Sequence, residues 1–218
     1  MKKRILCFGD SLTWGWKATS EGLLIERYSS EERWTGVLAK ELGGEFQVLE
    51  EGLSGRTTDL DDPLDNRLNG AAYLPTALAS HLPLDLVVIM LGTNDTKVYF
   101  DRSAFEISAA IRKLMTLVAM SAIGVSPVYS APKVLLMAPP PLSAIIPNRW
   151  VADLFEGGRQ KTIELARCIG NLSSLFDTPF IDVGQILSTE GADGIHLSGQ
   201  NNQMLGMELA DYIRSKIL

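Results

Sequence analysis

Five short apolar runs alternate with longer amphipathic patterns along this chain. The runs are rich in β-branched and other apolar residues, and they cover residues 4–8, 46–49, 86–91, 133–137 and 179–183. Their apolar positions are continuous, whereas a half-exposed strand would show alternating apolar and polar positions. A continuous apolar run of this length is typical of a strand that is buried on both faces of a sheet. Each run is therefore predicted to be such a strand.

Apolar residues recur at helical spacing between and after the runs. Three stripes of this kind extend over residues 34–42, 107–118 and 205–217, and helices are also expected around residues 70–80 and 151–174. Strands that alternate with helices predict an α/β fold with a parallel sheet covered on both faces. With right-handed crossovers, the favoured arrangement is a three-layer α/β/α, flavodoxin-like five-stranded sheet.

Length and charge narrow the class of protein. A chain of 218 residues is expected to form a single domain, residues 1–218, and its net charge of −6 comes without a stripe of Lys or Arg. We therefore expect no nucleic-acid partner. No apolar stretch approaches the ~20 residues of a membrane span, and the basic start precedes an apolar run too short for a signal peptide. The chain is accordingly expected to be cytoplasmic, without a membrane partner.

Histidine and cysteine are scarce, and this limits the possible chemistry. The two histidines, His81 and His196, and the two cysteines, Cys7 and Cys168, are too few for a zinc site built from several such ligands. In a cytoplasmic protein the cysteines are expected to be reduced thiols. We expect neither a metal nor an organic cofactor, and only two residues can supply an imidazole.

Polar residues follow the predicted strands where a parallel sheet gathers its reactive groups, beyond the carboxyl ends of the strands. Ser11 follows the first run, Gly55 the second and Asn94 the third, and His196 lies between the fifth run and the last helix. Asp193, three residues before His196, can reach the ring Nδ1 and fix the tautomer in which Nε2 accepts a proton. Each of these residues alone is more often a cap or turn residue.

Taken together, Ser, Gly, Asn and Asp-x-x-His in this order resemble the SGNH (GDSL-type) hydrolase superfamily, over nearly the whole chain. The resemblance implies the SGNH hydrolase fold, with Ser11 as the nucleophile, His196 as the general base and Asp193 as the residue that orients the ring. It also implies an oxyanion hole made by the backbone N–H groups of Ser11 and Gly55 and the side chain of Asn94.

The sequence around these residues most resembles the bacterial arylesterase and acyltransferase-perhydrolase branch, in particular at residues 9–16, 33–38 and 90–97. Some members of that branch carry Ala at the position of Gly55. Either residue donates the same backbone N–H, so the implied oxyanion role is kept, but the finer substrate preference is left open. Residues 17–33 and 139–159 look like insertion loops, since they are long for connections within a domain. The branch implies that they carry contacts of a homo-oligomer, an octamer being one form.

This chemistry predicts a serine esterase. A serine hydroxyl becomes a nucleophile when a base removes its proton, and the acyl-enzyme on Ser11 would pass its acyl group to water, an alcohol or peroxide. The substrates are expected to be small aryl or short-chain acyl esters. The alternative functions are those of a carbohydrate acetylesterase or a thioesterase of the same superfamily. The channel is predicted to be lined by Leu12, Trp14, Trp16, Thr93, Lys97, Trp150, Leu154, Phe155 and Ile195. For the aromatic residues, a place in the core is the alternative.

Three other classes compete with this interpretation. A noncatalytic binding module of the same fold would have no reason to keep the complete set of reactive residues. A nucleotide-binding α/β protein would carry G-x-G-x-x-G or G-x-x-x-x-G-K-[ST], and neither motif occurs here. An α/β-hydrolase would place its serine in G-x-S-x-G, which is also missing from the sequence.

Overall fold

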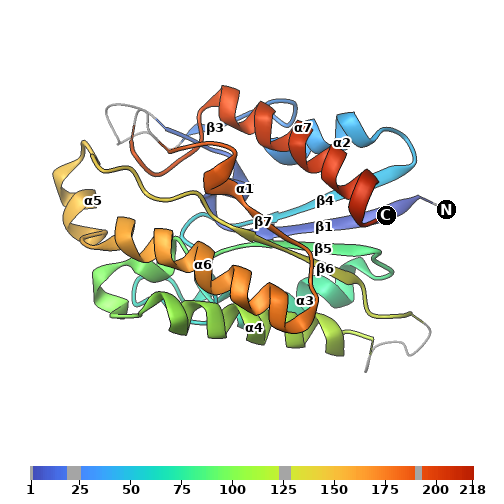
Figure 1. Ribbon diagram of the computed structural model, residues 1–218, viewed down its shortest axis with the longest axis horizontal. Coiled ribbons are helices and arrows are strands. Elements are labelled where there is room, and N and C mark those ends of the chain that lie inside the picture. The colour runs from blue at the N-terminus through green and yellow to red at the C-terminus, as the bar shows by residue number, and fades with distance from the viewer. Residues whose placement is uncertain (1, 19–25, 123–128, 190–192) are drawn as a thin grey trace.

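Five parallel strands form the centre of the protein in a computed structural model that describes residues 2–18, 26–122, 129–189 and 193–218. The strands are ordered β4-β1-β5-β6-β7 across the sheet (Figure 1). Their bounds are Lys3–Gly9 for β1, Phe46–Gly52 for β4, Leu86–Met90 for β5, Lys133–Ala138 for β6 and Phe180–Asp182 for β7. This is the flavodoxin-like order, and it confirms the predicted sheet.

Helices cover both faces of the sheet. On one face, α2 (Trp34–Leu42) packs against α7 (Gly199–Lys216). The other face carries α3 (Gly70–His81), α4 (Ala104–Met120) and α6 (Gly158–Phe176), so the three predicted layers are present (Figure 1). The shorter elements are α1 (Ser11–Trp14), α5 (Arg149–Leu154), the hairpin β2 (Trp16–Lys17) and β3 (Glu26–Arg27), and 3-10 turns at Asn66–Leu68, Asn94–Thr96, Val98–Phe100 and Val183–Gln185.

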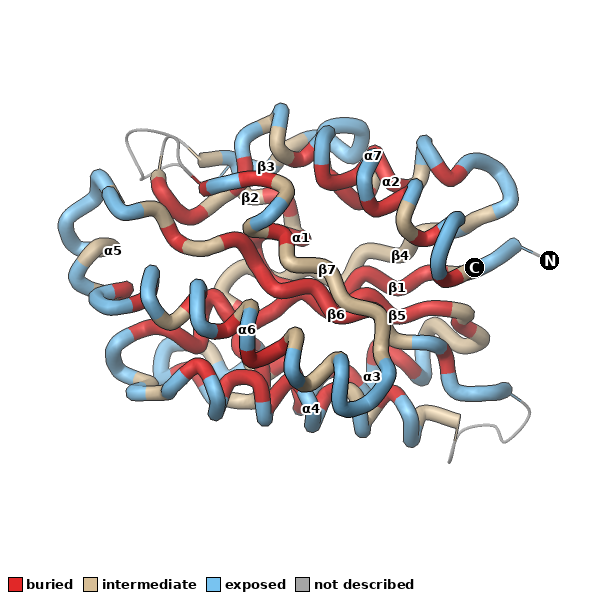
Figure 2. The backbone as a smooth tube through the Cα atoms, viewed as in Figure 1, coloured by how far each residue is buried: buried red, intermediate tan, exposed pale blue. Residues whose placement is uncertain are grey.

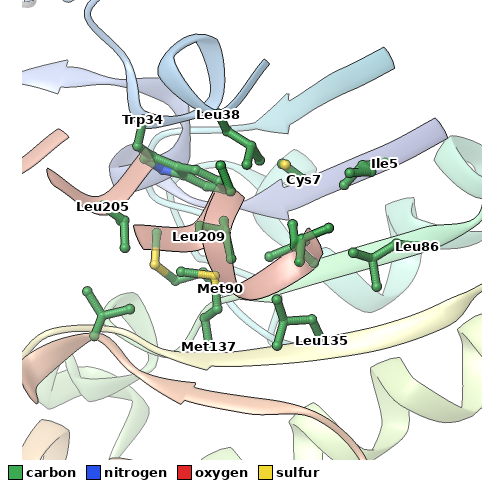
Figure 3. Packing of buried hydrophobic residues seen from close by; sticks show 14 of the residues in the cluster. Ile5, Cys7, Trp34, Leu38, Leu86, Met90, Leu135, Met137, Leu205 and Leu209 are labelled. Atoms are coloured by element: carbon green, nitrogen blue, oxygen red, sulfur yellow. The ribbon is translucent and has the colours of Figure 1, made fainter. Parts of the chain in front are cut away.

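Two apolar clusters, one on each face of the sheet, make up most of the core. Figure 2 shows the buried strands between helices whose outer surfaces are exposed. In the cluster of Figure 3, Trp34 and Leu38 of α2 and Leu205 and Leu209 of α7 lie over strand residues that include Met90. Alternate residues of each central strand point to opposite faces, and both faces are covered by apolar helix surfaces. The strands therefore need apolar residues at every position.

Burial on both faces holds for three of the five strands. The described residues of β1, β5 and β6 are almost entirely buried beyond their first positions, whereas β4 and β7 are mostly half-buried. The prediction was wrong for these two strands because the sheet order places them at the edges, where each has only one neighbouring strand. Strand order cannot be derived from the apolar pattern of a single run.

The predicted helices are present, with one difference. The segment 151–174 forms two helices, α5 and α6, separated at Phe155–Gly157, where Gly157 adopts a left-handed conformation with φ of 71°. A left-handed residue interrupts a right-handed helix, and glycine adopts this conformation with little strain. The break turns α5 away from α6 (Figure 1) and brings it beside the 3-10 turn Val98–Phe100.

The two predicted insertion loops differ in how far they can be described. In the segment 17–33, Lys17 of β2 pairs with Glu26 of β3, and residues 19–25 lie outside the described residues. The segment 139–159 is irregular apart from α5 and the start of α6. Within the described ranges, no helix is long and apolar enough to cross a membrane.

Candidate active site

Ser11 is the first residue of a short helix that follows directly on β1. The Asp10 carboxylate starts this helix, since its Oδ1 accepts a hydrogen bond from the backbone N–H of Leu12 at 2.9 Å. The serine Oγ lies 2.8 Å from Nε2 of His196. The predicted nucleophile and the predicted base are thus in direct contact, although they are 185 positions apart in the chain.

His196 is held by Asp193 within one tight turn before α7. Oδ2 of Asp193 lies 2.7 Å from the ring Nδ1, and Oδ1 accepts hydrogen bonds from the backbone N–H groups of Ile195 and His196, each at 2.9 Å. Burial alone would raise the pKa of Asp193. The hydrogen bonds from His196 and the interaction with its ring outweigh burial, so the pKa of Asp193 lies below its ordinary value. An ionised Asp193 favours the tautomer with the proton on Nδ1, which leaves Nε2 able to accept one from Ser11.

The indole of Trp16 covers the imidazole of His196. The ring centroids are 5.2 Å apart and the planes are inclined by 18°, which is a stacked arrangement. Trp16 belongs to the hairpin strand β2, so this hairpin contributes to the wall around the base. The stack restricts rotation of the imidazole about its own axis while Asp193 fixes its position.

The other predicted donors come from the loops after β4 and β5. Gly55 has a φ of 86°, a left-handed conformation in which glycine is favoured. Among the described residues, neither its backbone N–H nor that of Ser11 takes part in a hydrogen bond. The Asn94 side chain donates from Nδ2 to the carbonyl oxygen of Arg56 at 3.1 Å, and Nδ2 also lies 3.4 Å from Oδ2 of Asp10. Ser11, Gly55 and Asn94 line the same cavity.

The loop after β4 can approach Ser11 because Gly52 has no side chain. A Cβ atom at this position would lie 2.3 Å from the backbone nitrogen of Trp14, so any other residue would push the end of β4 away from α1. The glycine therefore permits the backbone contact that brings Gly55 beside Ser11.

Two fully buried carboxyl groups lie behind these loops. Burial raises the pKa of Asp10 to about 6, although its hydrogen bond from Leu12 and the nearby His196 act in the opposite direction. Burial also raises the pKa of Asp95 to about 6, against hydrogen bonds from the backbone and hydroxyl of Thr58. Each side chain forms hydrogen bonds to a loop that follows a different strand: Asp10 to Asn94 and Asp95 to Thr58. We therefore assign both carboxyl groups to holding the loops together.

The cavity at Ser11 has a volume of about 190 Å³. It is lined by Ser11, Trp16, Ser54, Gly55, Thr93, Asn94, Lys97, Val151, Leu154, Phe155, Ile195 and His196. Six of the nine residues that we predicted to line a substrate channel are in this set: Trp16, Thr93, Lys97, Leu154, Phe155 and Ile195.

The other three predicted channel residues lie elsewhere. Leu12 is buried in the apolar cluster beneath α2 and α7, since it faces the sheet from α1. Trp14 packs beside Trp16, with the Arg27 guanidinium over its ring. Trp150 is 69% exposed, because the phase of α5 turns its neighbours Val151 and Leu154 toward the cavity instead.

Two lining residues were missed by the sequence analysis. Val151 lies at the start of the predicted helix 151–174. The rotation of the helix about its axis must be known to decide whether Val151 or Trp150 faces the cavity. Ser54 stands beside Gly55 in the loop after β4, so its proximity to a predicted donor was an available signal.

One wall of the cavity carries a buried ion pair. Lys97 Nζ lies 3.1 Å from Oδ2 of Asp62, and Tyr99 donates its hydroxyl to the same oxygen at 2.8 Å. The Asp62 side chain is 1% exposed and that of Lys97 10%. Within the described residues, no group of three or more His, Cys, Asp or Glu side chains is arranged to bind a metal ion.

Comparison with known proteins adds a family and several solved structures. The model of the GDSL-like lipase/acylhydrolase family matches residues 7–203. The native aryl esterase of M. smegmatis is 57% identical, with a TM-score of 0.95 and coverage of 98% of this chain and 99% of that one. Est24, a carbohydrate acetylesterase from Sinorhizobium meliloti, is 51% identical, with a TM-score of 0.96 and the same coverage. A comparison with curated protein sequences found no match.

Proposed function

The chain belongs to the GDSL-like lipase/acylhydrolase family and is a serine ester hydrolase, and we propose that it cleaves small aryl and short-chain acyl esters through an acyl-enzyme on Ser11. One observation carries the proposal. Asp193, His196 and Ser11 form a continuous series of hydrogen bonds that ends in the cavity, with Oγ 2.8 Å from the base. This is the geometry that a serine needs to act as a nucleophile.

The proposed reaction has two halves. His196 takes the Ser11 proton as Oγ attacks the ester carbonyl, and then protonates the leaving alcohol. The negative oxygen of the tetrahedral intermediate is stabilised by the backbone N–H groups of Ser11 and Gly55 and by the Asn94 amide, each such donor contributing about 3–4 kcal/mol. A water molecule, activated by the same base, then releases the acid from Ser11.

The cavity supports a small acyl group. Its volume of about 190 Å³ is below the ~300 Å³ of common ligand pockets. Apolar side chains of Leu154, Phe155 and Ile195 contribute to its walls and favour an apolar acyl or aryl group. The relatives named above are an aryl esterase and a carbohydrate acetylesterase, and an acetyl group suits both names. Deacetylation of a carbohydrate is the second candidate, since a relative 51% identical carries that name.

Hydrolysis of p-nitrophenyl esters from acetate to palmitate tests this proposal. We expect the highest kcat/KM on acetate or butyrate and a steep fall beyond them, because longer chains exceed the cavity. Ser11→Ala should lower kcat by at least 10³-fold while the thermal melt is retained, and a fluorophosphonate should label wild type once per chain. Full activity of Ser11→Ala would exclude the mechanism, and a preference for palmitate would exclude the small-acyl specificity.

We also propose that the acyl-enzyme passes its acyl group to alcohols or peroxide. Apolar side chains in the cavity walls support transfer to alcohols, because they favour an organic acceptor over water at the acyl carbonyl. Ester turnover in water with and without added alcohol, with product analysis, measures the ratio. If the acid is the sole product at every alcohol concentration, transfer does not occur.

Two further expectations remain proposals. Association of copies is supported by Ile145 and Trp150, which are 75% and 69% exposed in the predicted contact segment 139–159. A stable monomer in light scattering at micromolar concentration would contradict it. Residence in the cytoplasm is supported by Cys7 and Cys168, both buried and without a disulfide, and cell fractionation tests it.

A further inference from the structure

Arg56 is a buried cation at the junction of the three loops that carry the proposed oxyanion donors. It follows Gly55 directly in the chain and is only 2% exposed. Its guanidinium lies over the ring of Phe8, with 4.3 Å to the centroid, and over that of Tyr73 at 5.2 Å. Phe8 belongs to β1 and Tyr73 to α3, so the side chain lies between the sheet and α3 beneath the active-site loops.

The hydrogen bonds of Arg56 reach each of these loops. Nη1 donates to the carbonyl oxygen of Gly9 at 2.9 Å, two residues before Ser11, and also to the carbonyl oxygen of Glu51 at the end of β4. Its own carbonyl oxygen accepts from Nδ2 of Asn94 at 3.1 Å. One residue therefore bonds to the loops of Ser11 and Asn94 and is covalently joined to Gly55.

This arrangement is costly for folding. Burial lowers the pKa of the Arg56 guanidinium, which reflects the loss of hydration of its charge. Its Nε has no hydrogen-bond partner within the described part of the chain, and none of the ion pairs found there includes Arg56. Attraction to the Glu51 and Asp10 carboxylates offsets part of this cost. A buried cation without a direct carboxylate partner is nevertheless less favourable than an apolar side chain of similar volume. Buried polar groups that cost folding stability in this way are concentrated at functional sites.

We propose that Arg56 is a positioning residue that fixes the distances between the three oxyanion donors. It acts through its neighbours and does not touch the substrate. Because oxyanion donors stabilise the transition state more than the ground state, misplacing them lowers kcat and leaves KM nearly unchanged. The inference rests on the proposed function, since it presupposes an oxyanion on the carbonyl bound at Ser11.

Arg4 offers a control on β1, the strand whose last residue, Gly9, accepts a hydrogen bond from Arg56. At the opposite end of β1, its Nη1 also donates to two backbone carbonyl oxygens, those of His81 at 2.7 Å and Pro83 at 3.0 Å. Arg4→Met thus also removes hydrogen bonds from a guanidinium to backbone carbonyl oxygens, here between β1 and the end of α3 and at the opposite end of β1 from Ser11. The experiment compares Arg56→Met, Arg56→Lys and Arg4→Met by thermal melts, by kcat and KM on p-nitrophenyl acetate, and by the Ki of an arylboronic acid, which forms a tetrahedral adduct on serine.

For Arg56→Met we expect kcat to fall at least tenfold with KM within twofold, and the boronic acid Ki to rise by the factor by which kcat/KM falls. Arg56→Lys should recover part of kcat, because its ammonium can still donate to the Gly9 carbonyl. Arg4→Met should melt earlier than wild type with kcat within twofold. A folded Arg56→Met with wild-type kcat overturns the inference. If Arg56→Met does not fold, Arg56→Lys decides, and an unchanged kcat and Ki there overturn it.

Failure of the proposed function gives a different result. In that case Ser11→Ala keeps its activity and wild type is not labelled by a fluorophosphonate. Failure of the inference alone leaves a Ser11-dependent enzyme whose kcat does not respond to Arg56.

Discussion

Asp193 holds His196 with both of its carboxylate oxygens: Oδ2 lies 2.7 Å from the ring Nδ1, and Oδ1 accepts from the backbone N–H of the same residue at 2.9 Å. One carboxylate thus fixes both the ring and the turn on which the ring stands. The two functions can be separated by a substitution that preserves the shape of the side chain.

Asp193→Asn should lower kcat by about 10³–10⁴-fold with little loss of stability. The amide oxygen can still accept from the backbone, but the amide NH₂ would donate to Nδ1 and force the ring proton onto Nε2, which then cannot accept from Ser11. Turnover of p-nitrophenyl acetate and a thermal melt measure the two effects. A kcat within tenfold of wild type would show that the tautomer is not set by Asp193.

Gly55→Ala should cost stability but retain activity. An L-residue at a φ of 86° is strained by about 1–2 kcal/mol, and the new Cβ would lie 3.0 Å from Cδ1 of Leu68, a side-chain end that can move. The backbone N–H is unchanged, so kcat on p-nitrophenyl acetate should stay within about threefold of wild type, since no donor is lost.

Urea denaturation of Gly55→Ala, measured beside Gly44→Ala, tests the strain. Gly44 has open space around its Cβ position and no positive φ, so its substitution should be neutral or slightly stabilising. Equal midpoints for the two variants would contradict a strained conformation at Gly55.

Asp10 should make the protein less stable as the pH rises from about 4 to 6. Its pKa is about 6 in the folded protein against an ordinary value of 3.8, so the folded state binds the proton more tightly. The unfolding free energy therefore declines as the carboxyl ionises, by up to about 3 kcal/mol from this group. The effect is complete above the folded pKa.

Asp10→Asn removes this titration and keeps an oxygen that can accept from Leu12. Urea unfolding of both proteins at pH 4, 5, 6 and 7 gives the difference in free energy. We expect wild type to lose stability relative to the variant through this range and the difference to level off near pH 7. A difference independent of pH would mean that Asp10 does not titrate there.

Lys97→Met should destabilise the protein strongly, by about 3–5 kcal/mol, because it leaves the Asp62 carboxylate buried without its cation. Lys113→Met is the control, since Lys113 forms an ion pair with Asp59 but its side chain is 56% exposed. Exposed pairs contribute about 0–1 kcal/mol. Equal thermal shifts for the two variants would contradict a burial-dependent role of Lys97.

The strands and long helices could be predicted because each one carries a local pattern. The runs near residues 4–8 and 86–91 begin and end within about two residues of β1 and β5, since continuous burial demands continuous apolar character. Helix α1 was not predicted: its four residues are too few to show a period. The half-buried state of β4 depends on its place in the sheet, which no local pattern contains.

In the candidate site, too, some residues could be predicted from the sequence and others depend on the folded arrangement. Ser11, Asn94 and His196 could be selected because they follow predicted strands in the order that resembles a known family of hydrolases. The role inferred for Arg56 could not be predicted, because it depends on hydrogen bonds to Gly9 and Glu51 that form only when the chain has folded. Similarly, the choice between Trp150 and Val151 depends on the rotation of α5 about its axis.

The contact between Ser11 and His196 joins the first strand of the sheet to the turn before the last helix. During synthesis on a ribosome, β1 and the loops after β4 and β5 emerge long before the turn at residues 193–196. A growing chain would therefore possess the proposed nucleophile and the proposed oxyanion donors before the proposed base. Esterase activity would appear only after the turn at residues 193–196 has left the ribosome, so its onset can report in a cell-free system when the two ends of the site meet.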